Sequence, residues 1–313
     1  MPQVLEWLLE ADNPSARYLA LTGLLDRPED DLETAAARVA IPAQRQGRAI
    51  LDAQWPEGYW VHPDVGYSPK YKASTWQVIF LAQMGMPPSP ATDRACGYLL
   101  DNARLPNGLF TADKTERGAI PCLGGNLLRA MRQLGCDDPR LDESTEALAQ
   151  EVVRDEFRCW CNAQPRAVRM RDGLPCAWAA VKALGAFAEV PAGRRSPSVQ
   201  SAVESGVALL LGGDLASGGY PAPGGPSPLW RKLGFPLAYA SDVLEALEVL
   251  LRLGAGRQPS FQAAVDVVAS KRDGAGRWAL EYTPHNTWSS FGPVGRPNKW
   301  VTLRALRALN VWG

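Results

Sequence analysis

The most regular feature of this chain is a set of apolar segments with helical spacing that each stop at glycine or proline. Apolar residues recur every three or four positions, as on one face of an α-helix, before a Leu-Gly or similar pair. Glycine accepts the left-handed conformation that closes a helix, and proline cannot continue one, so each stop predicts a helix end. Five such stops fall at Gly85, Gly135, Pro191, Gly254 and Gly313.

A second set of amphipathic helices is predicted between these segments, and most of them are followed by a turn and an aromatic residue, as in QWPEGYW and RLPNGLF. The segment over 15–28 is similar to a diverged sixth copy of the first set. Taken in chain order, the two sets give six hairpins, each of one outer and one inner helix. The outer helices are expected over 2–11, 31–54, 90–103, 141–156, 197–212 and 259–271.

The spacing of the inner helices indicates how the hairpins are arranged. Equivalent positions in the five clear copies lie 50 to 63 residues apart, which is longer than the repeat of common two-helix solenoids. The inner helices are rich in alanine and glycine, which permit close packing around an axis, and alternation typical of strands is nearly absent. We therefore predict an all-α fold, an (α/α)6 toroid with a central cavity, formed by a single domain over 1–313.

Composition excludes several classes of protein. The chain has 33 basic and 33 acidic residues with no block of like charge, which removes the electrostatic footprint of a nucleic-acid-binding protein. No apolar run reaches the roughly 18 to 20 residues of a membrane span, and the N-terminal stretch lacks the pattern of a signal peptide. We expect a cytoplasmic protein that binds a small molecule. A peripheral membrane contact and the oligomeric state are left open.

The turn-plus-aromatic pattern before the helices TW…LAQMG, PCLGGNLLRAM and PCAWAAVKAL resembles the prenyltransferase and squalene-oxidase repeat superfamily. This superfamily includes the class II terpene cyclases and the β subunits of protein prenyltransferases, and the resemblance covers nearly the whole chain. It implies an (α/α)6 barrel whose turn aromatics join neighbouring repeats. The chain lacks the DxDD motif with which class II cyclases protonate their substrates. It also has no Asp-x-Cys at the start of an inner helix, a feature of the zinc-dependent prenyltransferases.

Four cysteines are expected at one end of the barrel. Cys122 and Cys176 each follow a proline at the start of consecutive inner helices, and Cys159 and Cys161 lie in the loop before the second of them. Helix N-termini favour thiolates, and four thiolates form a sound tetrahedral Zn²⁺ site. With three cysteines, His62 is a candidate fourth ligand. The alternative is that Cys122 and Cys176 are small apolar residues at tight helix starts.

Polar and aromatic residues occupy equivalent positions on the inner helices. Lys182 and Arg304 are candidates to bind an anionic head group, such as a diphosphate or a carboxylate. Asp242 and Glu245 are candidate acids or bases. Alternatively, Asp242 is a helix N-terminal acid, and Lys182 with Glu245 forms a structural pair.

Further candidate substrate-binding residues lie on the inner helices and in two long loops. Trp76 could stabilise a cation with its ring, and Asn126 holds the equivalent position on the next inner helix. The loops over 54–72 and 279–300 both enter inner helices at the end where the cysteines lie, and long loops often carry function. They contribute His62, Tyr282 and His285.

These features favour an enzyme that acts on an isoprenoid, or a similar apolar substrate with a polar head, in the central cavity. Two alternatives are a non-catalytic scaffold that binds a lipid or peptide, and a carbohydrate-active lyase or hydrolase on the same toroid. A deep pocket with Asp242, Glu245 or a cysteine-bound metal at its floor would favour an enzyme of the first kind. A filled axis would favour the scaffold, and an open groove with paired carboxylates the carbohydrate enzyme.

Overall fold

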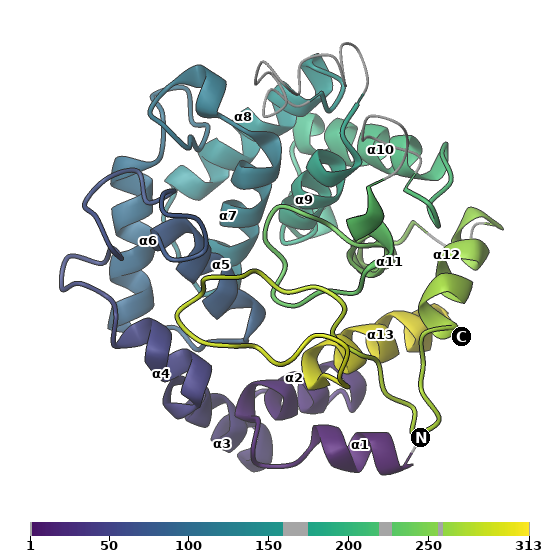
Figure 1. The fold of residues 1–313 in the computed structure, drawn as a ribbon. Coiled ribbons are helices and arrows are strands. Elements are labelled where there is room, and N and C mark those ends of the chain that lie inside the picture. The colour runs from purple at the N-terminus through teal and green to yellow at the C-terminus, as the bar shows by residue number, and fades with distance from the viewer. Residues whose placement is uncertain (1, 159–174, 219–226, 256–258, 313) are drawn as a thin grey trace.

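The computed structural model describes residues 2–158, 175–218, 227–255 and 259–312. Within these ranges the secondary structure is helical, apart from three isolated β-bridges, and the helices form a closed ring of hairpins (Figure 1). The predicted all-α toroid is confirmed. None of the helices in the described ranges has the length and apolarity that a bilayer crossing requires.

Six inner helices surround the axis, and the outer helices lie around them. The inner helices are α2 (Pro14–Leu24), α5 (Ser74–Gln83), α7 (Pro121–Gln133), α9 (Ala177–Phe187), α11 (Val243–Arg252) and α13 (Lys299–Trp312). The outer helices are α1 (Pro2–Leu8), α3 (Leu32–Ala40) followed by α4 (Arg45–Leu51), α6 (Pro90–Asn102), α8 (Arg140–Arg154), α10 (Pro197–Leu211) and α12 (Pro259–Ala269). Neighbouring inner helices pack in chain order from α5 to α13, and α13 packs on α2.

The predicted helix stops have a direct conformational cause. Gly85, Gly135 and Gly254 follow α5, α7 and α11 with φ of 72°, 80° and 71°, the left-handed conformation that closes a helix. Pro191 lies a few residues beyond the end of α9 at Phe187, and Gly313 lies outside the described residues. Local sequence therefore determines where most inner helices finish.

A buried serine closes the ring between its first and last hairpins. The Oγ of Ser15 on α2 donates a hydrogen bond to the carbonyl oxygen of Met84, at 2.7 Å, directly after α5. It also accepts one at 2.8 Å from the indole Nε1 of Trp300 on α13. One hydroxyl thus joins three inner helices.

Small residues allow the inner helices to approach closely, as the composition indicates. Gly125 on α7 faces the backbone of α9, and a Cβ atom at this position would lie 2.4 Å from the carbonyl oxygen of Lys182. No side chain fits there without separating the two helices. The closest part of the ring is therefore a contact between two helix backbones.

Tryptophans in the turns join outer helices to inner ones. The indole nitrogens of Trp60 and Trp278 each donate a hydrogen bond of 2.7 Å to a carbonyl oxygen ten residues earlier, Ile50 on α4 and Val268 on α12. Both side chains are fully buried. The turn aromatics are structural parts of the repeat, as the sequence pattern indicates.

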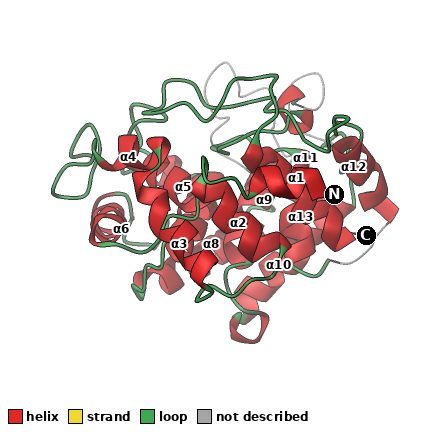
Figure 2. Cartoon of the chain, turned by 90° about the horizontal axis from the view of Figure 1, so that it is seen from below, coloured by secondary structure: helices red, strands yellow, loops and turns green. Residues whose placement is uncertain are grey.

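Long connections cover the end of the ring where the inner helices begin. The segments over 54–73, 232–242 and 279–298 lie together over this end, and Figure 2 shows the long loops gathered on one side of the helices. Trp288 donates a hydrogen bond to the carbonyl oxygen of Lys72, and the backbone N–H of Phe235 donates to the carbonyl oxygen of Tyr282. This end of the barrel is closed by its own loops.

A buried glutamate on α8 makes the stability of this fold depend on pH. Glu151 is 6% exposed, and its carboxylate has no hydrogen-bond or ion-pair partner among the described residues. Burial, assisted by Asp155, raises its pKa from 4.5 to about 7. Between these pH values the folded protein keeps a proton that the unfolded chain has lost. The free energy of unfolding therefore falls as the pH rises.

We expect Glu151→Gln to raise the free energy of unfolding at pH 8 by up to about 3 kcal/mol and to have little effect at pH 4. Urea denaturation at several pH values measures this difference. Glu204→Gln, on the exposed face of α10, is the matched control. An equal effect of Glu151→Gln at both pH values would contradict the prediction.

Candidate functional site

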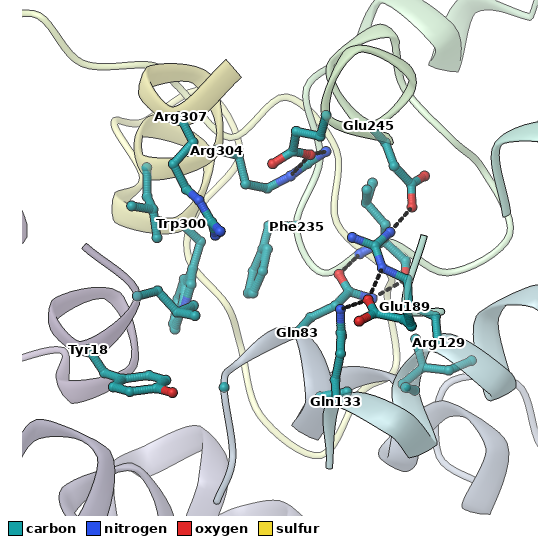
Figure 3. Close-up of a pocket in the computed structure, with 18 of the residues that line it drawn as sticks. Tyr18, Gln83, Arg129, Gln133, Glu189, Phe235, Glu245, Trp300, Arg304 and Arg307 are labelled. Carbon is teal, nitrogen blue, oxygen red and sulfur yellow. Dashed lines mark hydrogen bonds and ion pairs between the residues drawn. The ribbon is translucent and has the colours of Figure 1, made fainter. Parts of the chain in front are cut away.

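A pocket of 430 Å³ opens at the end of the ring where the inner helices finish (Figure 3). Gln83, Gln133 and Arg252 are the last residues of α5, α7 and α11, and all three line it. This end is opposite to the one covered by the long loops. The rim of the pocket is therefore formed by the ends of inner helices, while Glu245 and Trp300, near the starts of α11 and α13, line its deeper part.

The floor of the pocket is a backbone segment, residues 234–238, that lies inside the ring. The side-chain amide of Gln83 donates to the carbonyl oxygen of Leu237 at 2.7 Å and accepts from its N–H at 2.8 Å. Asn126 donates to the carbonyl oxygen of Ala238, and Arg304 to that of Gly234, both at 2.8 Å. Three inner helices hold this segment across the axis, and it separates the pocket from the loop-covered end.

Apolar side chains cover this floor. The ring of Phe235 stacks on Trp300, with centroids 4.8 Å apart and planes 7° apart. Leu237, Ile79 and Leu303 line the pocket beside them. These side chains are largely buried, with Phe235 2% and Trp300 and Leu237 each 4% exposed, so a small apolar part of each faces the pocket.

A buried ion pair stands behind one wall. The ammonium of Lys182 on α9 lies 2.8 and 2.9 Å from the two carboxylate oxygens of Glu245 on α11, and both side chains are nearly inaccessible. Arg129 on α7 approaches the same carboxylate at 3.3 Å. Burial alone would raise the pKa of Glu245, but the two cations outweigh it and hold that pKa below its usual range. Glu245 is therefore ionised.

A second charge cluster lies at the start of α11. Asp242 caps this helix by accepting from the N–H of Glu245 at 2.7 Å, and it accepts from the N–H of Gly234 at 2.8 Å. Arg304 on α13 bonds Asp242 at 3.1 Å and Glu248 at 2.7 Å. Burial opposes the charge of Arg304, but these two carboxylates outweigh it and raise its pKa. Both oxygens of Asp242 serve structural bonds.

Further pairs surround the opening. Glu189 accepts from Arg252 at 2.6 Å and from Gln133 at 2.7 Å. On the opposite side, Glu29 pairs with Arg38 and accepts from the hydroxyl of Tyr18. Burial raises the pKa of Tyr18 to about 12, so this phenol stays protonated.

One pocket cation has no acidic partner. Arg307 on α13 is exposed, and its guanidinium forms no ion pair or hydrogen bond with any residue in the described ranges. It extends toward the pocket from the same helix as Arg304 (Figure 3). Its side chain packs on Gly23 of α2, where a Cβ atom would lie 2.5 Å from Nε of Arg307. Arg307 is not among the sequence-predicted site residues, although it follows Arg304 by three residues and so shares its helix face.

The sequence-predicted residues fall into two groups. Asn126, Glu245 and Arg304 line the pocket, while Lys182 and Asp242 lie behind its wall. The remaining predicted substrate-binding residues are at the loop-covered end. The predicted residues therefore do not all line the same cavity. Their functional roles stay predictions.

Trp76 is the centre of an aromatic cluster at the loop-covered end. Its ring lies 5.2 Å from both Tyr71 and Tyr239, and its Nε1 donates to the carbonyl oxygen of Tyr67. Trp76 is fully buried, so no ligand reaches it in this conformation. Three predicted residues lie in the loops around this cluster: His62 and His285, which are exposed, and the half-buried Tyr282.

Two of the four cysteines predicted to bind Zn²⁺ lie among the described residues. Cys122 and Cys176 are buried at the starts of α7 and α9, which pack side by side. Cys159 and Cys161 lie outside the described residues. Within the described part of the chain no three histidine, cysteine or acidic side chains group as a metal site would require. The four-cysteine Zn²⁺ site stays a prediction.

Comparisons with known proteins assign no family to this chain. No family model and no curated protein matches the chain. Among solved structures, the chain is similar to an alanine variant of the type II terpene cyclase MstE from Scytonema in complex with its product merosterolic acid A. That alignment has 15% identity and a TM-score of 0.34, and it covers 99% of this chain and 98% of the cyclase. The toroid itself rests on the helix contacts described above.

The Lys182–Glu245 pair offers a test of the site's construction. Lys182→Met leaves a buried carboxylate with Arg129 at 3.3 Å as its nearest cation, so we expect it to cost about 3 to 5 kcal/mol of stability. Lys182→Met combined with Glu245→Leu removes both charges and should cost much less than the single change. Chemical denaturation of the variants measures this coupling. A double variant that loses as much stability as the two separate changes added together would show that the two side chains do not act as a pair.

Proposed function

We propose that this protein binds a small amphiphilic anion in the pocket at the C-terminal end of its inner helices. The apolar part of the ligand lies on the floor formed by Phe235, Leu237 and Trp300. The anionic head faces Arg307. The observation that carries the proposal is a pocket cation, Arg307, with no acidic partner among the residues that the structure describes, beside an apolar floor.

The floor supports a ligand with an apolar body. Phe235, Leu237 and Trp300 give the pocket an apolar lining of the kind that binds rings and unsaturated chains. The segment that carries Phe235 is held on three sides, by Gln83, Asn126 and Arg304. Such a fixed floor reduces the ordering that binding would otherwise require.

The charges of the wall support binding rather than acid catalysis. Glu245 is kept ionised by Lys182 and Arg129, and Asp242 is occupied by backbone N–H groups and Arg304. Neither is placed to donate a proton to a substrate in this pocket. The described lining residues include no histidine, cysteine, serine or lysine, and each of the four glutamates in the lining is held in an ion pair. A filled axis and such a pocket favour the non-catalytic binding hypothesis over the enzyme hypotheses.

The first test uses 1-anilinonaphthalene-8-sulfonate, an aromatic anion whose fluorescence rises in apolar surroundings. We expect saturable binding at one site per chain, weakened about tenfold by Arg307→Ala because the charge partner of the sulfonate is lost. Fluorescence titration measures the affinity. Arg272→Ala is the matched control, since Arg272 is exposed at the end of α12, outside the pocket. An equal loss in both variants, or no saturable binding, would argue against the site.

A second test separates binding from stability. Gly23→Ala places a methyl group 2.5 Å from the present position of Nε of Arg307, so the arginine side chain must shift from where it now lies. Alanine is the better helix former, by up to about 1 kcal/mol. We therefore expect this variant to unfold at an equal or higher temperature and to bind the same probe several-fold more weakly. Thermal unfolding and fluorescence titration on one preparation measure both, and unchanged affinity would contradict the proposed role of Arg307.

A further inference from the structure

The charges of the pocket also indicate which head group it accepts, an inference that rests on the proposed function. We infer that the site selects a singly charged head, as in a carboxylic acid, over a diphosphate or an uncharged alcohol with the same apolar chain. The sequence alone is compatible with either a diphosphate or a carboxylate head group.

The described residues that line the pocket are nearly balanced in charge. They include five arginines and four glutamates. The two further charged side chains that touch this set from behind, Lys182 and Asp242, are of opposite sign and cancel. Arg307 is the cation left in excess, so one negative charge on a ligand completes the balance.

A second cation is only weakly engaged. Arg129 makes one hydrogen bond, of 3.3 Å, to Glu245, and its other acidic neighbour, Glu189, lies 3.8 Å away. Both carboxylates have closer partners, Lys182 for Glu245 and Arg252 for Glu189. Arg129 therefore has free N–H donors on the same pocket that Arg307 lines. Both guanidinium groups therefore line one pocket with N–H donors of the kind that bind a carboxylate.

A more highly charged head would meet repulsion. Glu248, Glu189 and Glu245 all line the pocket, and their charges are matched by existing partners. A second or third negative charge on the ligand would exceed the one positive charge by which the described lining is in excess, and it would lie near these carboxylates. Like charges brought together in a partly desolvated site oppose binding, which is how such sites reject a wrong ligand.

One further acid lies close by. Asp26 lines an adjoining surface depression that Arg307 also borders, but it does not line the pocket, and its side chain is exposed. Its charge is therefore screened by water and salt. Asp26→Asn and Glu248→Gln each remove one negative charge near Arg307, and the second acts on the pocket lining. The two variants therefore change the net charge equally but differ in whether the altered residue lines the pocket.

The experiment compares three ligands with one apolar chain: geranic acid, geraniol and geranyl diphosphate. Isothermal titration calorimetry with the full chain at pH 7, below micelle-forming concentrations, measures their dissociation constants. We expect geranic acid to bind about tenfold tighter than either of the other two. Arg307→Gln should bring geranic acid down to the affinity of geraniol. Because Arg307 is exposed, this change should leave the fold intact.

Glu248→Gln is the gain-of-function arm. It frees positive charge on Arg304 while keeping an amide oxygen as an acceptor, so geranyl diphosphate should bind several-fold tighter than to the unaltered protein. Asp26→Asn should leave the preference among the three ligands unchanged. This pattern would support selection by the pocket charges.

The experiment distinguishes a failure of the head-group inference from a failure of the proposed binding function. Diphosphate binding as tight as that of the acid to the unaltered protein would overturn the head-group inference and leave the proposed binding function standing. Equal shifts with Asp26→Asn and Glu248→Gln would also overturn it, since net charge alone would then explain the preference. Saturable binding of the anilinonaphthalene probe with no binding of any geranyl ligand would reject this ligand class. Binding of neither probe nor ligands would overturn the proposed function itself.

Discussion

The pocket depends on a short stretch of backbone that is held inside a ring of helices. Residues 234–238 have no regular secondary structure that could satisfy their polar groups inside the ring. Gln83, Asn126 and Arg304, from three different inner helices, supply the missing donors and acceptors. Unpaired buried backbone groups are costly, so these bonds fix both the segment and the spacing of the helices around it. The segment therefore blocks the central space of the toroid, and the pocket is the part of that space that remains open on one side of it.

The fold was predictable because its signals are local. A helix stop needs only a glycine that adopts positive φ, and Gly85, Gly135 and Gly254 do so. A close helix contact needs only the absence of a side chain, as at Gly125. Such features repeat along the chain at hairpin spacing, so periodicity alone identified inner and outer helices. The ring closure through Ser15 could not be found this way, because its partners lie 69 and 285 residues away.

The site was less predictable because its signals are relations between distant residues. Equivalent positions on the inner helices identified Asn126, Glu245 and Arg304, which line the pocket, but also Lys182, which lies behind its wall, and Trp76, which lies at the loop-covered end. Nothing in the loop sequence shows that residues 234–238 descend into the ring, since their partners are 70 to 154 residues away along the chain. The role of Arg307 likewise depends on having no partner, a property of the assembled charges. The sequence drew attention to the end where cysteines and long loops gather, whereas the pocket lies at the other end.

The ion pairs around the pocket bear on specificity more than on stability. Burying Lys182 with Glu245 removes two ions from water, and apolar residues of similar volume would often be at least as stable. What the pairs provide is a defined charge at each wall position. Glu245 stays ionised because two cations face it, and Arg304 stays charged because two carboxylates face it. With these groups fixed in charge, Arg307 is left as the excess cation of the described lining. In a chain with equal numbers of acidic and basic residues, this local imbalance does not follow from net charge. It follows from which side chains the ring brings together, and that is why the pocket can distinguish ligands by the charge of their heads.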